Sequence, residues 1–203
     1  MKSVSALGVI EFSDIPAGVF ATDAMLKRAP IAFVRSGTIT RGRFLTVIGG
    51  TPAAVEESMA EGLYCGGGSV IDRLMLPDVH PRVFDAVLGD RRPGGSGSLA
   101  IVETATATSA IRAAEAALKA TPVDLVEIRL ADAGLSGKGL GVYRGELPDI
   151  EAAVEIVLQG LREHGAEAAC RIIPDPHDAL ARQLGAGTEF GSAALLELEG
   201  EEG

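Results

Sequence analysis

The stretch LGVIEFSDIPAGVFATDAMLKRAP, residues 7 to 30, recurs as LAIVETATATSAIRAAEAALKATP at residues 99 to 122. The two segments align without a gap at an offset of 92. The offset becomes 95 where GRFLTVIGGTPAAVEE (42–57) pairs with GKGLGVYRGELPDIEA (137–152), and 97 where LPDVH (76–80) pairs with IPDPH (173–177). Duplicated domains accumulate such small shifts in their loops, so we expect two related domains.

The start of each copy predicts a strand followed by a helix. Residues 6–12 form a short apolar run, and Asp14 with Pro16 supplies a helix cap and a first-turn proline. Pro30 and Pro122 are expected to end the two helices. Helical spacing predicts one inward-facing stripe in each copy: Ile15, Val19, Thr22 and Leu26, and then Ala107, Ile111, Ala114 and Leu118.

The rest of each copy predicts two strands, a helix and a final strand. In the first copy, strands over 31–34 and 44–50 flank a polar loop over 35–43. A helix begins at Thr51 and Pro52 with Val55 and Met59 facing inward, and a strand follows over 69–76. The order β-α-β-β-α-β indicates an α+β fold of two tandem ferredoxin-like units, each an antiparallel sheet with helices on one face.

The predicted domain boundaries follow from the composition along the chain. We expect a first domain over 1–88, a Gly- and Arg-rich linker over 89–98, a second domain over 99–190 and an acidic tail over 191–203, in which ELEGEEG at 197–203 is expected to be disordered. The chain of 203 residues is 47% hydrophobic with a net charge of −10, which argues against nucleic-acid binding. No apolar run approaches the ~20 residues of a membrane span, so we expect a soluble cytosolic protein. Cys65 and Cys170 lack the spacing of a disulfide framework or zinc site and are interpreted as buried hydrophobes.

The elements LGVIEF, DAMLKRAP, GRFLTVIGG and LPDVHP, which recur as LAIVET, EAALKATP, GKGLGVYRGE and IPDPH, resemble the bacterial microcompartment shell domain. The resemblance covers residues 6–184 and indicates the unpermuted tandem type. It implies a homotrimer whose six domains form a flat pseudohexamer that tiles edge to edge with other shell proteins. It also implies a structural role without catalysis, in a microcompartment shell in the bacterial cytoplasm.

The resemblance implies contacts between tiles at the end of the first helix of each copy. Lys27 and Lys119 match the edge lysine of the family. In many members an arginine precedes the histidine of the second edge motif, whereas this chain carries Asp78 and Asp175 there. His80 and His177 match the motif's histidine, and we interpret both as structural groups and not as metal ligands.

The resemblance also implies a pore on the threefold axis, lined by residues 36–42 and 130–137. The expected lining residues are Thr38, Ile39, Thr40, Arg41, Asp132, Ala133, Gly134, Leu135 and Ser136. Some tandem members hold an iron–sulfur cluster through a cysteine at the Thr40 position, and threonine cannot supply the thiolate that a cluster needs. We therefore expect no cofactor and no metal. Hydroxyls, amides and Arg41 favour small polar or anionic metabolites, and Asp132 opposes anions if it faces the axis.

Three apparent enzyme signals fail. GLSGKGLG at 134–141 resembles a phosphate-binding loop, but that motif needs glycine at 132 and Ser or Thr at 139, where this chain has Asp132 and Gly139. CGGGS at 65–69 follows a helix, which indicates a helix-ending turn. Glu11 and Glu103 are matched carboxylates at strand ends. Catalytic carboxylate pairs need different environments to separate their pKa values, so equivalent positions in a repeat indicate structural roles. Two alternatives stay open: a ferredoxin-like sensor that binds effectors at subunit clefts, and an enzyme with a cleft between the two halves.

Overall fold

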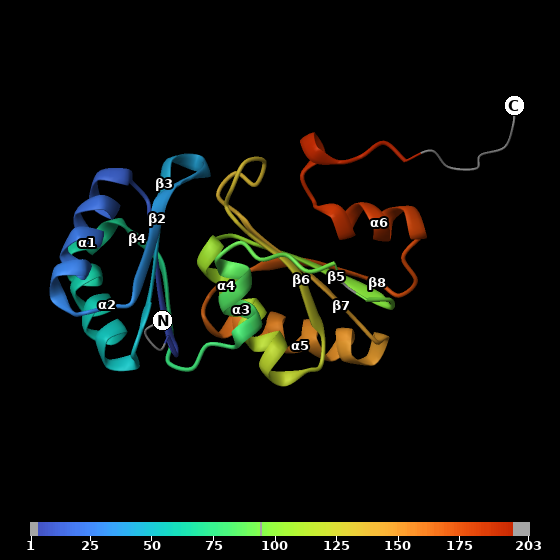
Figure 1. The fold of residues 1–203 in the computed structure, drawn as a ribbon, viewed down its shortest axis with the longest axis horizontal. Helices are drawn as coiled ribbons and strands as arrows, with labels where there is room; N and C mark the ends of the chain where they lie inside the picture. Colours follow the sequence, from blue (N-terminus) through green and yellow to red (C-terminus); the bar gives the residue numbers. More distant parts are fainter. Residues whose placement is uncertain (1–3, 94, 197–203) are drawn as a thin grey trace, which may run out of the picture.

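The computed structural model describes residues 4–93 and 95–196, which form two domains side by side (Figure 1). The first domain contains β1 (Ala6–Phe12), α1 (Ile15–Arg28), β2 (Phe33–Ile39), β3 (Arg43–Gly50), α2 (Pro52–Gly66), β4 (Val70–Leu76) and α3 (Pro81–Val87). The second contains β5 (Ser98–Thr104), α4 (Ala107–Ala120), β6 (Asp124–Leu130), β7 (Gly139–Gly145), α5 (Leu147–Glu163), β8 (Ala168–Ile173) and α6 (Asp178–Ala186). The predicted fold of two tandem ferredoxin-like units is confirmed, and each unit also carries a closing helix.

Both sheets are antiparallel and share one topology. The strand orders are β2-β3-β1-β4 and β6-β7-β5-β8. Glu11 on β1 lies opposite Leu45 on β3, and Glu103 on β5 lies opposite Leu140 on β7. The register therefore reproduces both sequence offsets, 92 for the first strand and 95 for the third. It fixes which residues of the two domains are counterparts.

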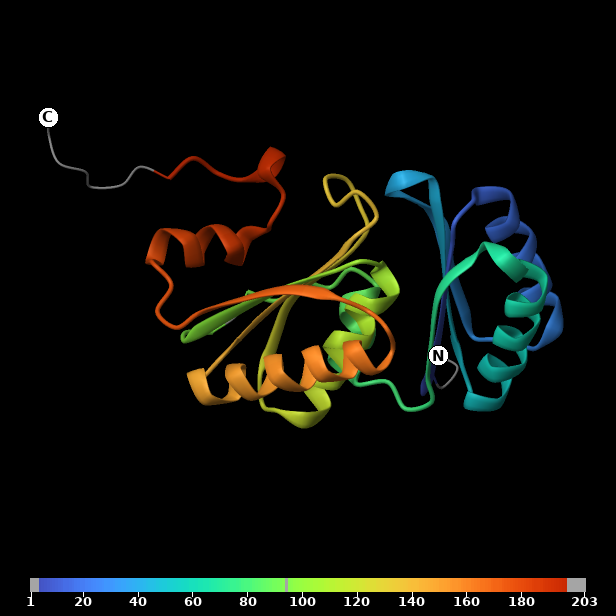
Figure 2. The same ribbon diagram turned by 180° about the vertical axis from the view of Figure 1, so that it is seen from behind.

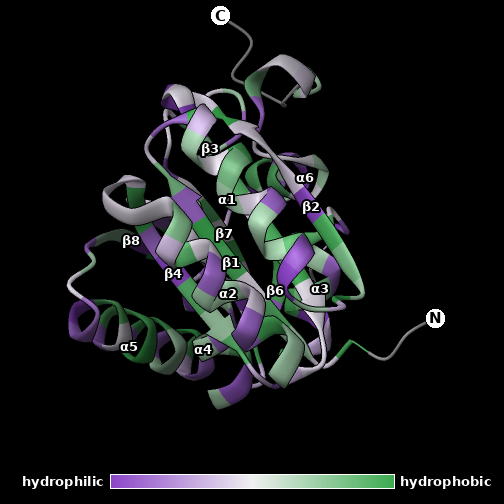
Figure 3. Ribbon diagram, turned by 90° about the vertical axis from the view of Figure 1, so that its left-hand side faces the viewer, coloured by the Kyte–Doolittle hydropathy of each residue, from purple (hydrophilic) through white to green (hydrophobic). Residues whose placement is uncertain are grey.

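Side-chain caps begin the helices where the sequence predicts. The Asp14 carboxylate accepts a hydrogen bond from the Ala17 amide at 2.9 Å, and Thr51 accepts one from Ala54 at 3.3 Å. In the second domain Thr106 accepts from the Ser109 amide at 3.0 Å. Both first helices end two residues before their proline. In the view of Figure 3, α1 and α2 lie together over one face of the first sheet.

The buried face of α1 differs from the predicted stripe. Small residues face the sheet. The approach at Gly18 is so close that an added Cβ would lie 2.5 Å from the Phe44 ring. Thr22 is buried as predicted and its hydroxyl lies 2.6 Å from that of Thr46, whereas Ile15, Val19 and Leu26 are exposed in the single chain. The prediction for α1 is thus wrong at these three positions. In α4 the matching residues Ala107, Ile111 and Ala114 are all fully buried.

The α4 helix is buried on two sides because it also packs against the first domain. Its N-terminal half lies on β1 and β4, and α3 crosses over to pack against β6 and α4. Figure 2 shows α3 and α4 together on the second domain's side. Arg82 of α3 is buried and donates to the Leu125 and Val126 carbonyls at 3.0 and 3.3 Å. The two domains thus share one continuous interface.

Several boundaries differ from the sequence prediction. Strand β2 continues to Ile39, so the predicted loop over 35–43 shrinks to a 3₁₀ turn at Thr40–Gly42. Ser98, placed in the linker, begins β5. Cys65 and Cys170 are half-buried free thiols and not fully buried. The predicted disorder of the acidic tail concerns residues 197–203, which lie outside the described residues.

Candidate functional site

The two connections predicted to line a pore meet at one end of the domain interface. Figures 1 and 2 show the β2–β3 turn next to the β6–β7 loop, residues 131–138. The Thr40 hydroxyl donates to the Ala131 carbonyl at 2.6 Å and accepts from the Gly137 amide at 2.8 Å. The Thr40 amide donates to the same carbonyl at 2.9 Å. Thr40 therefore joins the two loops.

The tips of these loops present few side chains to solvent. Arg41 and Ser136 adopt left-handed φ angles of 69° and 50°, which turn the chain sharply. Exposed loop residues are Arg41, Gly42, Ala133, Gly134, Ser136 and Lys138, while Leu135 is half-buried. Thr38 and Ile39 belong to β2 and not to the loop. The exposed chemistry is thus the Arg41 guanidinium, the Lys138 ammonium, which pairs with Glu103, a hydroxyl and backbone amides.

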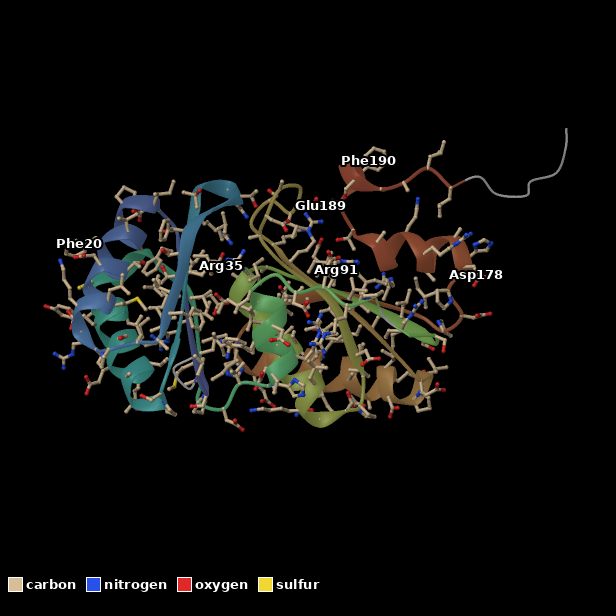
Figure 4. The ribbon with its side chains drawn as sticks, in the orientation of Figure 1. Phe20, Arg35, Arg91, Asp178, Glu189 and Phe190 are labelled. Atoms are coloured by element: carbon tan, nitrogen blue, oxygen red, sulfur yellow. The ribbon has the colours of Figure 1, made fainter. Side chains whose placement is uncertain are left out.

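The charge of Asp132 is balanced within the second domain. Its carboxylate accepts hydrogen bonds from Arg129 Nε at 3.0 and 3.1 Å. Arg129 also donates to Thr188 at 3.2 Å and lies 3.4 Å from Glu189, which Figure 4 labels near the C-terminal segment. No sequence motif marks Arg129, because its partners lie up to 60 residues away.

Beside the loops, Glu11 is fully buried between the domains. It accepts from Arg43 at 2.8 Å and from the Thr108 amide at 3.3 Å. Burial raises the pKa of Glu11, and the hydrogen bonds from Thr108 and Arg43 offset only part of that rise. The counterpart Glu103 pairs with Lys138 at 2.7 Å, and its side chain is 40% exposed. The two carboxylates therefore have different surroundings, contrary to the expectation from their matched positions.

A second polar cluster, also without a sequence signal, docks α4 on the first domain. Asp72 accepts from the Thr106 hydroxyl at 2.5 Å and from the Ser109 hydroxyl at 2.8 Å. Arg112 donates to the Arg73 carbonyl at 2.7 Å. These contacts fix the start of α4 against the edge strand β4.

The predicted edge residues lie at the other end of the same interface. Lys119 donates to the Asp78 carbonyl and pairs with Glu115 at 2.8 Å. The Glu115 carboxylate also accepts from the His80 amide at 3.0 Å. The structure thus brings together Lys119, Asp78 and His80 from two domains.

The counterparts of these residues, Lys27, Asp175 and His177, lie apart in a single chain. Lys27 is exposed and pairs with Asp23 at 2.5 Å, and Asp175 is exposed. The imidazole of His177 caps α6 by accepting from the Ala179 amide at 3.2 Å, and His80 caps α3 in the same way. Both histidines thus have structural contacts.

The described residues hold no group of three or more His, Cys, Asp or Glu side chains suited to a metal ion. Among the helices of that part of the chain, none combines the length and apolar character needed to cross a membrane.

Comparison with known proteins agrees with this architecture. The BMC domain model matches residues 6–79 and again 98–176. The chain is 35% identical to the bacterial microcompartment shell protein PduT of Citrobacter freundii, over 88% of this chain and 97% of that protein. A crystal structure of a microcompartment protein from Desulfitobacterium hafniense superposes with a TM-score of 0.76 at 34% identity, covering 89% of this chain and 99% of the other. A double-ringed trimeric shell protein of the RMM microcompartment shares the fold, with a TM-score of 0.57 at 18% identity over 77% of this chain and 82% of the other.

Two BMC domains therefore occur in unpermuted order along one chain. The chain belongs to the BMC-domain family and is a tandem-domain shell protein of a bacterial microcompartment.

Proposed function

We propose that three chains close into a ring of six domains, in which the contact between chains repeats the contact between the domains of one chain. The supporting observation is the exposed face of α1. Val19 and Phe20 are 52% and 63% exposed, whereas their counterparts Ile111 and Arg112 pack against the first domain. An apolar helix face of this kind on a soluble domain favours a protein partner.

The contact within one chain and the proposed contact between chains differ at two positions. Asp72, which binds α4 within the chain, corresponds to Ala169, since the two lie opposite Glu11 and Glu103. Arg112, on the helix that Asp72 binds, corresponds to Phe20. A polar pair within the chain is thus matched by an apolar pair between chains, with Phe20 of one chain packing near Ala169 of the next. Asp72 and Arg112 are both replaced by apolar residues in the other copy, and this joint replacement supports a contact between Phe20 and Ala169.

The ring would place the loops around a central pore. Thr40, Arg41 and residues 132–136 lie at one end of the domain contact. Arg129 balances the charge of Asp132, which leaves Arg41 to favour small polar or anionic metabolites. Opposite the loops, Lys119, Asp78 and His80 would lie at the rim with Lys27, Asp175 and His177, where tiles meet other shell proteins. In this proposal the protein is structural and carries out no catalysis.

Sedimentation analysis tests the ring directly. The wild-type chain should sediment as a stable particle of three 20.8 kDa chains. Replacing both Val19 and Phe20 by Asp should release folded monomers, because two buried charges would replace the apolar contact. Tyr64→Asp is the matched control, since Tyr64 is 84% exposed on α2 and its counterpart Gln159 on α5 is also exposed. A monomeric wild type, or a double variant that stays trimeric, would overturn the proposal.

A further inference from the structure

A small cavity lies between the two domains beside the pore loops. It has a volume of about 240 Å³. Its walls come from β2, β3, the end of α3 and the end of β6 with the residues after it, and they include Arg35, Gly37, Ile39, Val87, Leu130 and Asp132. Figure 4 shows Arg35 on the side of the first domain that faces the second.

The second domain fills the equivalent space with its own side chain. Gly37 lies opposite Leu45, and Arg129 lies opposite Leu140, so Gly37 and Arg129 are counterparts. The Arg129 guanidinium binds Asp132, Thr188 and Glu189. A Cβ added at Gly37 would meet nothing within 4 Å. The first domain therefore leaves open the place that an arginine occupies in the second.

The charged residue beside this space has the opposite sign in the second domain. Arg35 lies opposite Val47 and Glu127 opposite Val142, so these two residues are counterparts. Glu127 is bound by Arg91 at 3.1 Å and by the Thr188 hydroxyl at 2.9 Å. Arg35 instead donates through Nη1 to the Val87 carbonyl at 3.0 Å. Within the described part of the chain, its other guanidinium nitrogens have no hydrogen-bond partner.

The chemistry of the open cavity is that of a cation beside an apolar wall. Asp132 is neutralised by Arg129, so Arg35 sets the sign of the charge. Because side chains alternate along a strand, Ile39 lies on the same face of β2 as Arg35, and Val87 and Leu130 complete the wall. The volume lies below the roughly 300–1,000 Å³ of pockets for larger ligands.

We propose that this cavity binds a short-chain carboxylate, with its head group on the Arg35 guanidinium and its alkyl tail against Ile39, Val87 and Leu130. A guanidinium matches the planar carboxylate through two parallel N–H donors. The cavity is built within one chain, so the proposal does not depend on the ring of three chains.

Methyl-labelled protein titrated with sodium butyrate at constant ionic strength tests the proposal. We expect saturable NMR shifts at the methyl groups of Ile39, Val87 and Leu130. Arg35→Gln should weaken binding by about tenfold, because a charge-assisted hydrogen bond is lost. Gly37→Leu should abolish binding by filling the cavity while leaving the rest of the spectrum unchanged.

Two controls separate the charge from the cavity. Arg171→Gln removes an exposed guanidinium outside the cavity, whose contact is with its own strand at Cys170, and should bind butyrate like the wild type. Butyramide has the same tail without the charge and should cause no saturable shift. Binding of butyramide equal to that of butyrate, or wild-type binding by Gly37→Leu, would overturn the proposal. So would saturable binding of inorganic phosphate at these methyl groups without binding of butyrate.

Discussion

Glu11 and Glu103 occupy the same position on the central strands of the two sheets, yet only Glu11 is fully buried, against Arg43 and the start of α4. Glu103 lies near the surface beside Lys138. Duplication has thus given one carboxylate two environments within a single chain.

The burial of Glu11 predicts a pH dependence of stability. Its pKa is raised above 4.5 in the folded chain, mainly by burial, so the folded state resists ionisation. The stability that this group contributes is therefore fully present below pH 4.5 and is lost as the pH rises through the folded-state pKa. Glu11→Gln should flatten this part of the profile, measured by urea unfolding at a series of pH values from 4.5 upward. Glu103→Gln is the matched control, and an unchanged profile in Glu11→Gln would contradict the prediction.

Tyr143→Phe is expected to stabilise the protein. The Tyr143 hydroxyl is buried and has no hydrogen-bond partner among the described residues, and burial raises its pKa. The counterpart in the first domain is Ile48, which is fully buried without a polar atom. Removing an unsatisfied hydroxyl should raise the free energy of unfolding by about 1 kcal/mol. Urea unfolding at fixed protein concentration measures the change, and a loss of stability would show that the hydroxyl has a partner.

Gly18→Ala is expected to destabilise the first domain. The added Cβ would lie 2.6 Å from the Cβ of Phe44, an atom next to the backbone that cannot move aside easily. Overpacking should lower the free energy of unfolding by about 1–3 kcal/mol. The same change at Gly160 of α5, where a Cβ meets nothing within 4 Å, should raise it by up to about 1 kcal/mol. Equal effects at the two sites would refute the close contact of α1 with β3.

In the proposed assembly, the Lys27→Ala, Lys119→Ala double variant should keep the trimer and lose the tiling. The side chains of Lys27 and Lys119 are 75% and 45% exposed, so their ion pairs add only ~0–1 kcal/mol to stability. Sedimentation would follow the trimer, and electron microscopy of concentrated protein would follow the sheets. A Lys138→Ala, Arg171→Ala variant loses two positive charges elsewhere and should still tile. Dissociation of the trimer in the lysine variant would show that these residues hold the ring together.

Local signals in the sequence were sufficient to predict the strand and helix order. Asp14, Thr51 and the prolines at 30 and 122 act within a few residues of their own position, so their effects could be read directly. The repeat itself also predicted which residues of the two domains correspond, because counterparts keep constant offsets within each element.

The missed features depend on contacts between distant segments. Val19 and Leu26 follow a helical stripe, yet Gly18 and Phe44 decide which face of α1 meets the sheet. Helical spacing alone cannot distinguish an apolar stripe that packs on its own sheet from one that is exposed on the single chain. The Arg129 cluster and the cavity at Gly37 likewise join residues from different elements, and only the strand register reveals that the two positions correspond.

The linker over residues 89–97 gives the contact between the two domains a high effective concentration. Tethered groups meet without the loss of freedom that separate molecules incur, so modest polar contacts such as those of Asp72 can hold α4 in place. A contact between separate chains has no such help and needs more apolar area. In the proposed ring, Phe20 on α1 would lie in the contact between separate chains, whereas the arginine at the matching place on α4 lies in the contact within one chain.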